Sequence, residues 1–322
     1  MIYSKEKNKS YYLSIVIPLY NEEANVEELY KLLVKNLKFL KENYEILFID
    51  DGSLDKTWQK ISFLSLENKN VISIRLSRNF GKQHALLAGL SHSSGQAIIT
   101  IDGDLQHPPS LIERMIEKHK QGYKIVTTHR NYEQATSFFK RKSSFLFYKV
   151  FSFLADFSMS PGSSDFLLLD KIVLNQVLKL QNVDLFFRGA IEWLGFKSTK
   201  ISYNADKRFS GDSKFTIAKL FNQANGSIIS FSTKPLIVSL WIGIITSLLA
   251  LFEIVYVIIQ WLNGAGDKVP GWASTIIIVS FFFGILFILL GVIGSYLARI
   301  HIALQNRPRF VISEITSSNK ES

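Results

Sequence analysis

The stretch Ala97-Ile98-Ile99-Thr100-Ile101-Asp102-Gly103-Asp104-Leu105-Gln106-His107 joins a short apolar run directly to a turn rich in oxygen-bearing side chains. The apolar run has the length and the β-branched content of a buried strand. Asp102 and Asp104, two residues apart on a tight turn, can direct both carboxylates at one hard divalent cation that bridges a diphosphate. Asp-Gly-Asp is also an ordinary turn sequence, so its interpretation depends on the surrounding chain.

The surrounding chain alternates short apolar strands with amphipathic helices from residue 12 to residue 128. The expected strands are 13–18, 44–50, 71–77, 97–101 and 124–128, and the expected helices are 23–41, 56–67, 82–93 and 110–121. Such alternation predicts a parallel, doubly wound α/β sheet. Ligands bind such sheets beyond the carboxyl ends of the strands.

Four of the expected strands end in polar groups, at residues 18–22, 50–53, 78–79 and 102–107. Their common position at one sheet edge favours a metal site over an ordinary turn at Asp102 and Asp104. Asp50 and Asp51 can serve either helix capping or nucleotide binding. One of the two carboxylates, or Ser53, can cap the following helix while the other carboxylate faces a nucleotide. Neither a Gly-x-Gly-x-x-Gly loop nor a P-loop sequence occurs, so dinucleotide binding and P-loop hydrolysis are not indicated.

Composition limits the class of protein further. The 322 residues include 37 Lys and Arg against 27 Asp and Glu, a net charge of +10, and 47% are hydrophobic, which excludes a largely disordered chain. The absence of Cys excludes disulfides, thiolate metal sites and cysteine nucleophiles. The positive charge suits nucleic acid, an anionic membrane or phosphorylated substrates, and the C-terminal third favours the membrane.

Two apolar runs, 236–262 and 273–298, are long enough to cross the roughly 30 Å hydrocarbon layer, and Glu253 is the only ionisable residue within them. Basic residues flank the outer ends of both runs, so the positive-inside bias predicts a hairpin in the inner (plasma) membrane with both termini cytoplasmic. Residues 1–11 contain no apolar segment that would export the region before residue 236.

Residues 137–159 form a basic amphipathic pattern that predicts an interfacial helix, with packing on the domain or on a neighbouring subunit as the alternative. Residues 215–235 predict a second, juxtamembrane interfacial helix, and residues 299–322 a cytoplasmic tail.

Four motifs together resemble the inverting family-two glycosyltransferases, and within them the polyprenyl-phosphate glycosyltransferases, such as dolichyl-phosphate mannose synthases and bactoprenol glucosyltransferases. They are Ile17-Pro18-Leu19-Tyr20-Asn21-Glu22, Asp50-Asp51-Gly52-Ser53-Leu54-Asp55, Asp102-Gly103-Asp104-Leu105-Gln106-His107-Pro108-Pro109 and Arg208-Phe209-Ser210-Gly211-Asp212-Ser213-Lys214. The likeness covers about residues 12–300. It implies a nucleotide-sugar-binding GT-A domain over 12–214, with a Rossmann-like, mostly parallel sheet, followed by interfacial helices and a two-helix transmembrane hairpin.

The resemblance also implies roles for individual residues. Those expected at the nucleotide sugar are Pro18, Tyr20, Glu22, Asp50, Asp51 and Asp102, and those expected to hold Mg2+ or Mn2+ are Asp102, Asp104 and Gln106. The residues expected at donor or acceptor phosphates are Arg130, Arg208, Ser213 and Lys214. Asp165 matches the family's acidic residue near the acceptor, as a base or as a group that orients the acceptor or Arg208.

The chemistry supports the phosphate-binding roles more firmly than the base. Negative charge develops on a leaving nucleoside diphosphate, and a divalent ion with Arg208 and Lys214 would stabilise it. An acceptor phosphate monoester has its second pKa at about 6 and is already largely ionised near pH 7. A general base is therefore not strictly needed, which leaves both options for Asp165 open.

The expected reaction transfers a hexose, glucose from UDP-glucose, to polyprenyl (undecaprenyl) phosphate with inversion. A GDP-mannose or aminoarabinose donor is an alternative, and so is a non-catalytic membrane anchor that binds nucleotide sugar. A nucleic-acid binder is disfavoured, because much of the basic charge is juxtamembrane and no recognised motif occurs. The resemblance also implies a homo-oligomer, with a tetramer as one form.

Overall fold

The computed structural model describes residues 11–41, 43–131, 163–180, 187–204, 232–263, 271–305 and 307–318. The chain divides into two units, an α/β unit that includes residues 307–322 and a helical unit centred on residues 218–306. The expected interfacial helix 137–159, residues 215–231 of the second interfacial helix, and Arg208, Ser213 and Lys214 lie outside the described residues.

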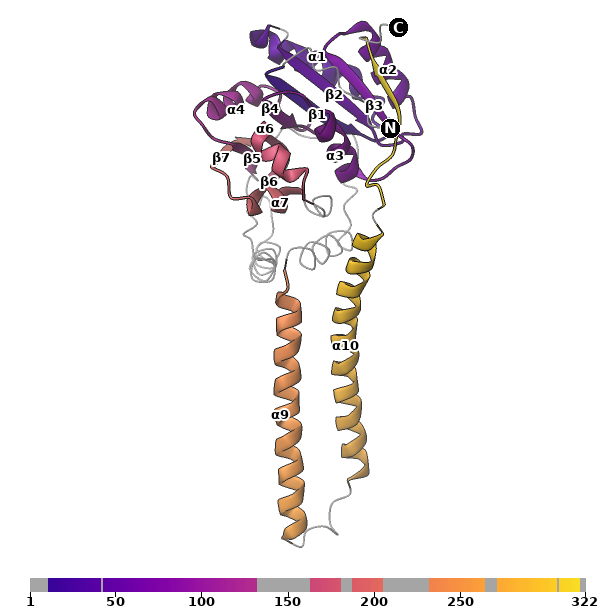
Figure 1. Ribbon diagram of the computed structural model, residues 1–322, viewed down its shortest axis with the longest axis vertical. Coiled ribbons are helices and arrows are strands. Elements are labelled where there is room, and N and C mark those ends of the chain that lie inside the picture. The colour runs from indigo at the N-terminus through magenta and orange to yellow at the C-terminus, as the bar shows by residue number, and fades with distance from the viewer. Residues whose placement is uncertain are drawn as a thin grey trace. The chain divides into compact units, whose positions relative to one another are not determined.

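The α/β unit is built on an eight-stranded sheet, counted over the described residues, with the order β7-β5-β6-β4-β1-β2-β3-β8 (Figure 1). Its strands are β1 (Leu13–Leu19), β2 (Tyr44–Asp50), β3 (Val71–Leu76), β4 (Ala97–Thr100), β5 (Ile125–Asn131), β6 (Ser163–Asp170), β7 (Ser198–Asn204) and β8 (Ile312–Ser317). β1 to β4 pair in parallel, as the alternation of strands and helices predicts. The α/β class is confirmed, with a sheet that is mixed rather than parallel throughout.

The mixed character comes mainly from β6, which lies between β4 and β5 and is antiparallel to both. The sequence predicts the fifth strand as one more member of a parallel series, but β5 pairs with β6 and β7 and not with β4. Because β6 runs in the opposite direction, its first residues lie at the edge where β4 ends. Asp165, near the start of β6, is thereby brought to the carboxyl ends of the parallel strands.

Helices cover both faces of the sheet, because strand side chains alternate between the faces. One face buries Ile15, Ile17 and Phe48 in a core that also contains Leu29, Leu33, Trp58 and Met115. These four come from α1 (Val26–Leu37), α2 (Thr57–Glu67) and α4 (Leu111–Lys120). On the other face α3 (Lys82–His92) packs so closely that a Cβ on Gly89 would lie 2.4 Å from Val16 Cγ1. α6 (Lys171–Val177) and α7 (Phe187–Trp193) complete the helices of this unit, and the short 3-10 turn η1 (Lys38–Leu40) follows α1.

The chain's last described segment is part of the sheet. β8 pairs antiparallel with β3, and Arg309 Nη2 donates to the Leu180 carbonyl at 2.7 Å. The sequence predicts only a tail for residues 299–322, because six residues whose partner strand lies more than 230 positions away give no local signal. In the structure this segment covers an edge that β3 would otherwise leave open.

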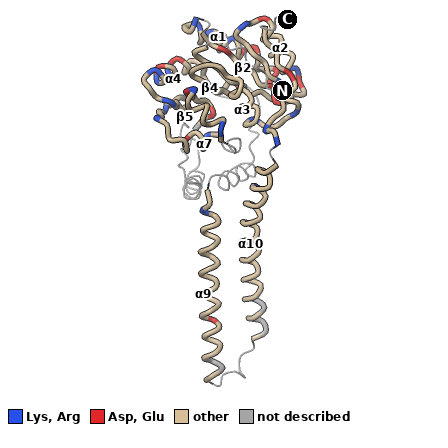
Figure 2. The backbone as a smooth tube through the Cα atoms, viewed as in Figure 1, with Lys and Arg blue, Asp and Glu red and all other residues tan. Residues whose placement is uncertain are grey.

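The helical unit contains α9 (Lys234–Leu262) and α10 (Trp272–Leu304). Within them, Lys234–Ile259 and Ile278–Leu304 are long and apolar enough to cross a membrane, judged by length and composition. Charged residues are frequent in the α/β unit and sparse along both helices (Figure 2). Tyr296 Oη donates to the Ser232 carbonyl at 2.8 Å, so the end of α10 lies beside the start of α9, as in a hairpin.

Candidate active site

The loops that follow β1 and β2 are tied to each other at the carboxyl edge of the sheet. Asn21 N–H donates to Ser53 Oγ at 2.9 Å, and Leu54 N–H donates to Asn21 Oδ1 at 2.9 Å. Glu22 N–H donates to Thr57 Oγ1, also at 2.9 Å. These bonds fix the loop from Pro18 to Glu22, where Tyr20 is exposed and Pro18 and Glu22 are half-buried. The exposed Tyr20 ring is therefore available to a ligand from a loop that three hydrogen bonds hold in place.

The carboxylates of Asp50 and Asp51 are buried and already bonded within the protein. Asp50 Oδ1 accepts from Ser53 N–H at 3.0 Å, and its Oδ2 lies 3.4 Å from Arg75 Nε. Asp51 accepts from Phe80 N–H at 2.8 Å through Oδ1 and from Gly81 N–H at 3.0 Å through Oδ2. Burial raises the pKa of Asp51, although these two N–H groups favour its charge. Asp51 therefore fixes the backbone that leads into α3.

Helix capping at α2 differs from the expectation for Asp51 and Ser53. The helix begins at Thr57, and Asp55 Oδ1 accepts from Thr57 N–H at 2.9 Å. Ser53 Oγ is used instead to bind the loop after β1. Ser53 lies four residues before the first residue of α2, which is too far for its side chain to cap the helix.

The Asp-Gly-Asp turn follows β4 at the same edge. A Cβ on Gly103 would lie 2.3 Å from Leu19 Cδ2, so a side chain at this position would require the Leu19 side chain to shift. Leu105 has φ of 60°, a left-handed conformation that is unusual for leucine. Asp104 Oδ1 accepts from Gln106 N–H at 3.2 Å, which closes the turn.

The turn has the donors of a hard-cation site. Asp102, Asp104 and Gln106 are half-buried and offer carboxylate and amide oxygens, the ligands that Mg2+ and Mn2+ prefer. A cation already lies against one of them, because Lys82 Nζ is 2.7 Å from Asp102 Oδ1. Among the described residues no three His, Asp or Glu side chains gather as a metal cluster. The oxygen atoms of Asp102, Asp104 and Gln106 fit a hard cation by their chemistry, and they supply only part of the coordination that Mg2+ or Mn2+ requires.

His107 connects this turn to β6. Asp102 N–H donates to His107 Nδ1 at 3.3 Å, so the proton is on Nε2, which donates to Ser164 Oγ at 2.8 Å. The ring stacks on Phe166 with centroids 5.3 Å apart. Burial lowers the pKa of His107 and keeps the ring neutral, although Asp102 and Asp104 lie nearby. The structure buries this side chain between the turn and the strand.

Asp165 lies between two cations beside the turn. Lys82 Nζ is 2.7 Å from Asp165 Oδ2, and Arg188 Nε is 3.0 Å from Asp165 Oδ1. Burial disfavours the charge on Asp165, but Lys82 and Arg188 outweigh it and lower the pKa of this carboxyl to about 2. Partial burial likewise disfavours the charge on Lys82, yet Asp102 and Asp165 raise its pKa above the ordinary 10.5. The four side chains form a row of alternating charges.

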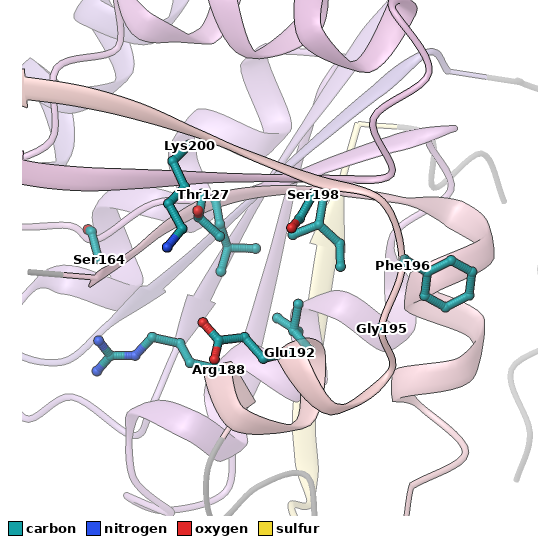
Figure 3. Close-up of a pocket in the computed structure, with 11 residues that line it drawn as sticks. Thr127, Ser164, Arg188, Glu192, Gly195, Phe196, Ser198 and Lys200 are labelled. Atoms are coloured by element: carbon teal, nitrogen blue, oxygen red, sulfur yellow. The ribbon is translucent and has the colours of Figure 1, made fainter. Parts of the chain in front are cut away.

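Arg188 also lines a cavity of about 400 Å³ between α7 and the strands β5, β6 and β7 (Figure 3). Its other polar groups come from Thr127, Ser164, Glu192, Ser198 and Lys200, and its apolar surface includes Ile125, Leu167, Ile191 and Phe196. The lining of the cavity begins at Ser164, the residue before Asp165, and continues along β5, β7 and α7. Its mixture of cations and apolar side chains suits an anionic group attached to hydrocarbon.

The structure brings most of the expected site residues to one sheet edge. Arg130 is placed in β5 but its side chain lies outside the described residues, as do Arg208, Ser213 and Lys214 entirely. Lys82 and Arg188 were not singled out from the sequence. One signal for Lys82 was available, since a cation in the first turn of a helix opposes the helix dipole and needs a partner. Arg188 offered none, because its partner Asp165 is 23 positions away.

An oxygen-rich turn and two cations, Lys82 and Arg188, lie at the carboxyl edge of the α/β sheet, and comparison with known proteins names the family. Residues 14–178 match the model of glycosyl transferase family 2. An uncharacterized glycosyltransferase of Synechocystis is 39% identical over 94% of this chain and 95% of its own. An uncharacterized glycosyltransferase of Bacillus subtilis is 37% identical over 94% and 93%. A prophage-derived bactoprenol glucosyl transferase of Shigella flexneri is 34% identical over 95% and 99%.

The chain therefore belongs to glycosyl transferase family 2, and the protein is a glycosyltransferase with a GT-A-like mixed sheet. This confirms the resemblance seen in the four sequence motifs.

Proposed function

We propose that the protein transfers glucose from UDP-glucose to the phosphate of a polyprenol such as undecaprenyl phosphate, with inversion at the sugar carbon. The observation that carries the proposal is the Asp102–Asp104 turn beside Asp165 in a chain that matches a bactoprenol glucosyl transferase along nearly its whole length. That likeness supports glycosyl transfer to a lipid carrier. A GDP-mannose or aminoarabinose donor differs only in groups that the described residues do not discriminate.

The donor is proposed to bind along the loop after β1 and at the Asp-Gly-Asp turn. Pro18, Tyr20 and Glu22 face the nucleotide, and the buried Asp50 and Asp51 hold the adjoining loops in place. Asp102, Asp104 and Gln106 would hold Mg2+ or Mn2+. Such an ion neutralises the negative charge that develops on the departing diphosphate.

On the acceptor side, Asp165 is proposed to orient cations rather than to remove a proton. Both of its oxygens contact a cation, and a carboxyl with a pKa of about 2 is a weak base. The acceptor phosphate needs little deprotonation, because its second pKa is about 6. Arg188, Lys200 and Ser164 would face the phosphate, and the apolar lining of their cavity suits the first part of the hydrocarbon chain. Glu192 lies at the same cavity and limits how much negative charge it accepts.

The phosphate-binding roles of Arg130, Arg208, Ser213 and Lys214 are proposed from their motifs. They lie in or after β5 and β7, whose carboxyl ends belong to the same sheet edge. Together with Arg188 they would enclose the diphosphate and the acceptor phosphate in positive charge.

The protein is proposed to act at the cytoplasmic face of the inner membrane, with α9 and α10 as two spans. Because β8 follows α10 and pairs within the α/β unit, the chain must return to the side it left, which an even number of crossings achieves. The basic flanks assign that side to the cytoplasm. The interfacial helices 137–159 and 215–235 and a homo-oligomer, such as a tetramer, complete the proposed arrangement.

The test is transfer of labelled sugar to undecaprenyl phosphate by the full chain in detergent, with UDP-glucose, UDP-galactose, UDP-N-acetylglucosamine and GDP-mannose as donors. Metal-dependent labelling from UDP-glucose is expected, and its loss is expected in Asp104→Ala with the fold retained. Labelling from another donor alone would replace glucose in the proposal. Full activity of Asp104→Ala would remove the metal assignment, and no labelling from any donor would favour the non-catalytic anchor.

A further inference from the structure

Lys82 lies at a position that is electrostatically unfavourable for a cation. It is the first residue of α3, and the positive end of a helix dipole disfavours a cation there. Its ammonium is compensated by two carboxylates, with Nζ 2.7 Å from both Asp102 Oδ1 and Asp165 Oδ2. The side chain is 43% exposed, so this double contact is not imposed by burial.

The backbone before Lys82 is fixed as well. Asp51 accepts from the N–H groups of Phe80 and Gly81, and Gly81 has φ of 99°, a conformation that favours glycine. A Cβ on Gly52 would lie 2.5 Å from the carbonyl carbon of Arg78, so this loop also packs tightly against the turn after β2. The start of α3 is therefore a rigid base from which Lys82 reaches the metal turn.

We propose that Lys82 occupies Asp102 in place of the divalent cation while no donor is bound, and that it stays on Asp165 when the cation takes Asp102. The proposal rests on the metal assignment made under the proposed function. An ammonium and a divalent cation compete for the same carboxylate oxygen and repel each other at this distance. Lys82 thus weakens metal binding to the empty site.

This competition makes metal binding depend on the donor. A nucleoside diphosphate brings negative charge that compensates the metal and Lys82 together, so the ion and the donor bind as a pair. When the metal ion takes Asp102, Lys82 keeps its contact with Asp165 Oδ2. Arg188 Nε, 3.0 Å from Asp165 Oδ1, holds the other oxygen of that carboxylate. Lys82 and Asp165 are therefore positioning residues for the metal turn.

The test is binding of Mn2+ alone, without nucleotide, to the full chain in detergent, measured from the electron paramagnetic resonance signal of free Mn2+. Lys82→Met removes the charge but keeps the length of the side chain, and Mn2+ should bind it about tenfold more tightly than wild type. Lys82→Arg keeps the charge, and its Mn2+ affinity should stay near that of wild type. With saturating UDP, which supplies the compensating charge, the difference between Lys82→Met and wild type should shrink.

Lys60→Met is a matched control. Lys60 Nζ also lies 2.7 Å from a carboxylate oxygen, that of Glu27, and its side chain is 35% exposed. The Lys60→Met substitution removes one positive charge, as Lys82→Met does, but at a site away from Asp102. The Mn2+ affinity of Lys60→Met should therefore equal that of wild type. Equal thermal unfolding midpoints of the variants would confirm that all are folded.

Unchanged or weaker Mn2+ binding by Lys82→Met would overturn the inference. Lys82 would then have no effect on Mn2+ affinity, or would increase it. Tighter binding that persists in the double variant Lys82→Met/Asp102→Asn would also overturn it, since the gain would arise at another site. The measurement needs no sugar transfer. Tighter Mn2+ binding with no transfer from any donor would therefore contradict the proposed function and leave this inference standing.

Discussion

At the scale of single residues, the charge on Asp165 depends on its two cationic neighbours. Lys82 and Arg188 contact its two oxygens, and its side chain is 13% exposed, so solvent screens the pair contacts only in part. A carboxylate in this setting holds cations in place and releases protons readily. The same setting makes it unsuited to accept a proton near pH 7.

The pKa of Asp165 gives a signed prediction for stability. The folded protein lowers this pKa from 3.8 to about 2, so the stabilisation is complete above about pH 4 and is lost as the pH falls to about 2. The difference in free energy of unfolding between wild type and Asp165→Asn should therefore shrink by about 2 kcal/mol between pH 5 and pH 2. Chemical denaturation in detergent at several pH values measures it, and a difference independent of pH would contradict the assigned contacts.

The rate of transfer by Asp165→Asn separates orientation from proton removal. If Asp165 orients Lys82 and Arg188, the rate falls by a similar factor at every pH, expected at tenfold or more, and the pH profile keeps its shape. A base would instead leave a loss that higher pH partly restores. Initial rates between pH 5.5 and 9 distinguish the two, and a wild-type rate would exclude both roles.

At the scale of secondary structure, the loop from Arg78 to Gly81 links the turn after β2 to the start of α3. Gly52→Ala should disturb it, because the added Cβ meets Arg78 and Asn79 backbone atoms at 2.5 and 2.7 Å and φ is 68°. We expect a loss of about 2 kcal/mol in stability and a fall in transfer. Gly122→Ala is the control, since its φ is 90° but nothing lies within 4 Å of the added Cβ. Thermal midpoints that fall equally would show that the close approach is unimportant.

The edge strand β8 gives a second prediction at this scale. A chain that ends at Gln305 leaves β3 with an unpaired edge that includes Ile72 and Ile74. Its α/β unit should unfold at a lower temperature and aggregate more readily than that of a chain lacking only residues 319–322. Light scattering during a thermal scan compares the two. Identical midpoints and scattering would mean that β8 adds nothing to the sheet.

The same elements show what sequence can and cannot predict. β1 to β4 and the helices between them are confirmed close to their expected bounds, because each has a local hydrophobic period and a clear end. The direction of β6 and the existence of β8 depend on partner strands chosen after long excursions of the chain, which no local period encodes. The candidate site likewise has parts that local sequence predicts and parts that depend on distant partners. Its strand-end motifs were predicted, whereas the Lys82–Asp165 contact spans 83 positions and required the antiparallel β6.

At the scale of the whole molecule, the proposed topology is open to a direct test. The chain has no cysteine, so a single introduced one is a unique label. An impermeant maleimide should label Asp267→Cys, between the two spans, in intact cells, and Glu314→Cys, at an exposed position of β8, only after the membrane is permeabilised. The opposite pattern would reverse the proposed orientation, and labelling of both in intact cells would contradict a hairpin that crosses twice.

The pairing of β8 with β3 has a consequence for how the protein is made. β8 follows both apolar helices along the chain, so the rest of the α/β unit is synthesised before it and emerges with its β3 edge uncovered. Only a chain that has been translated beyond β8, and whose β8 lies on the same side of the membrane as that unit, can close the edge. A chain cut before β8, or one whose apolar helices do not form the proposed hairpin, would keep the β3 edge exposed, so in the proposed topology a closed sheet requires both spans to be inserted.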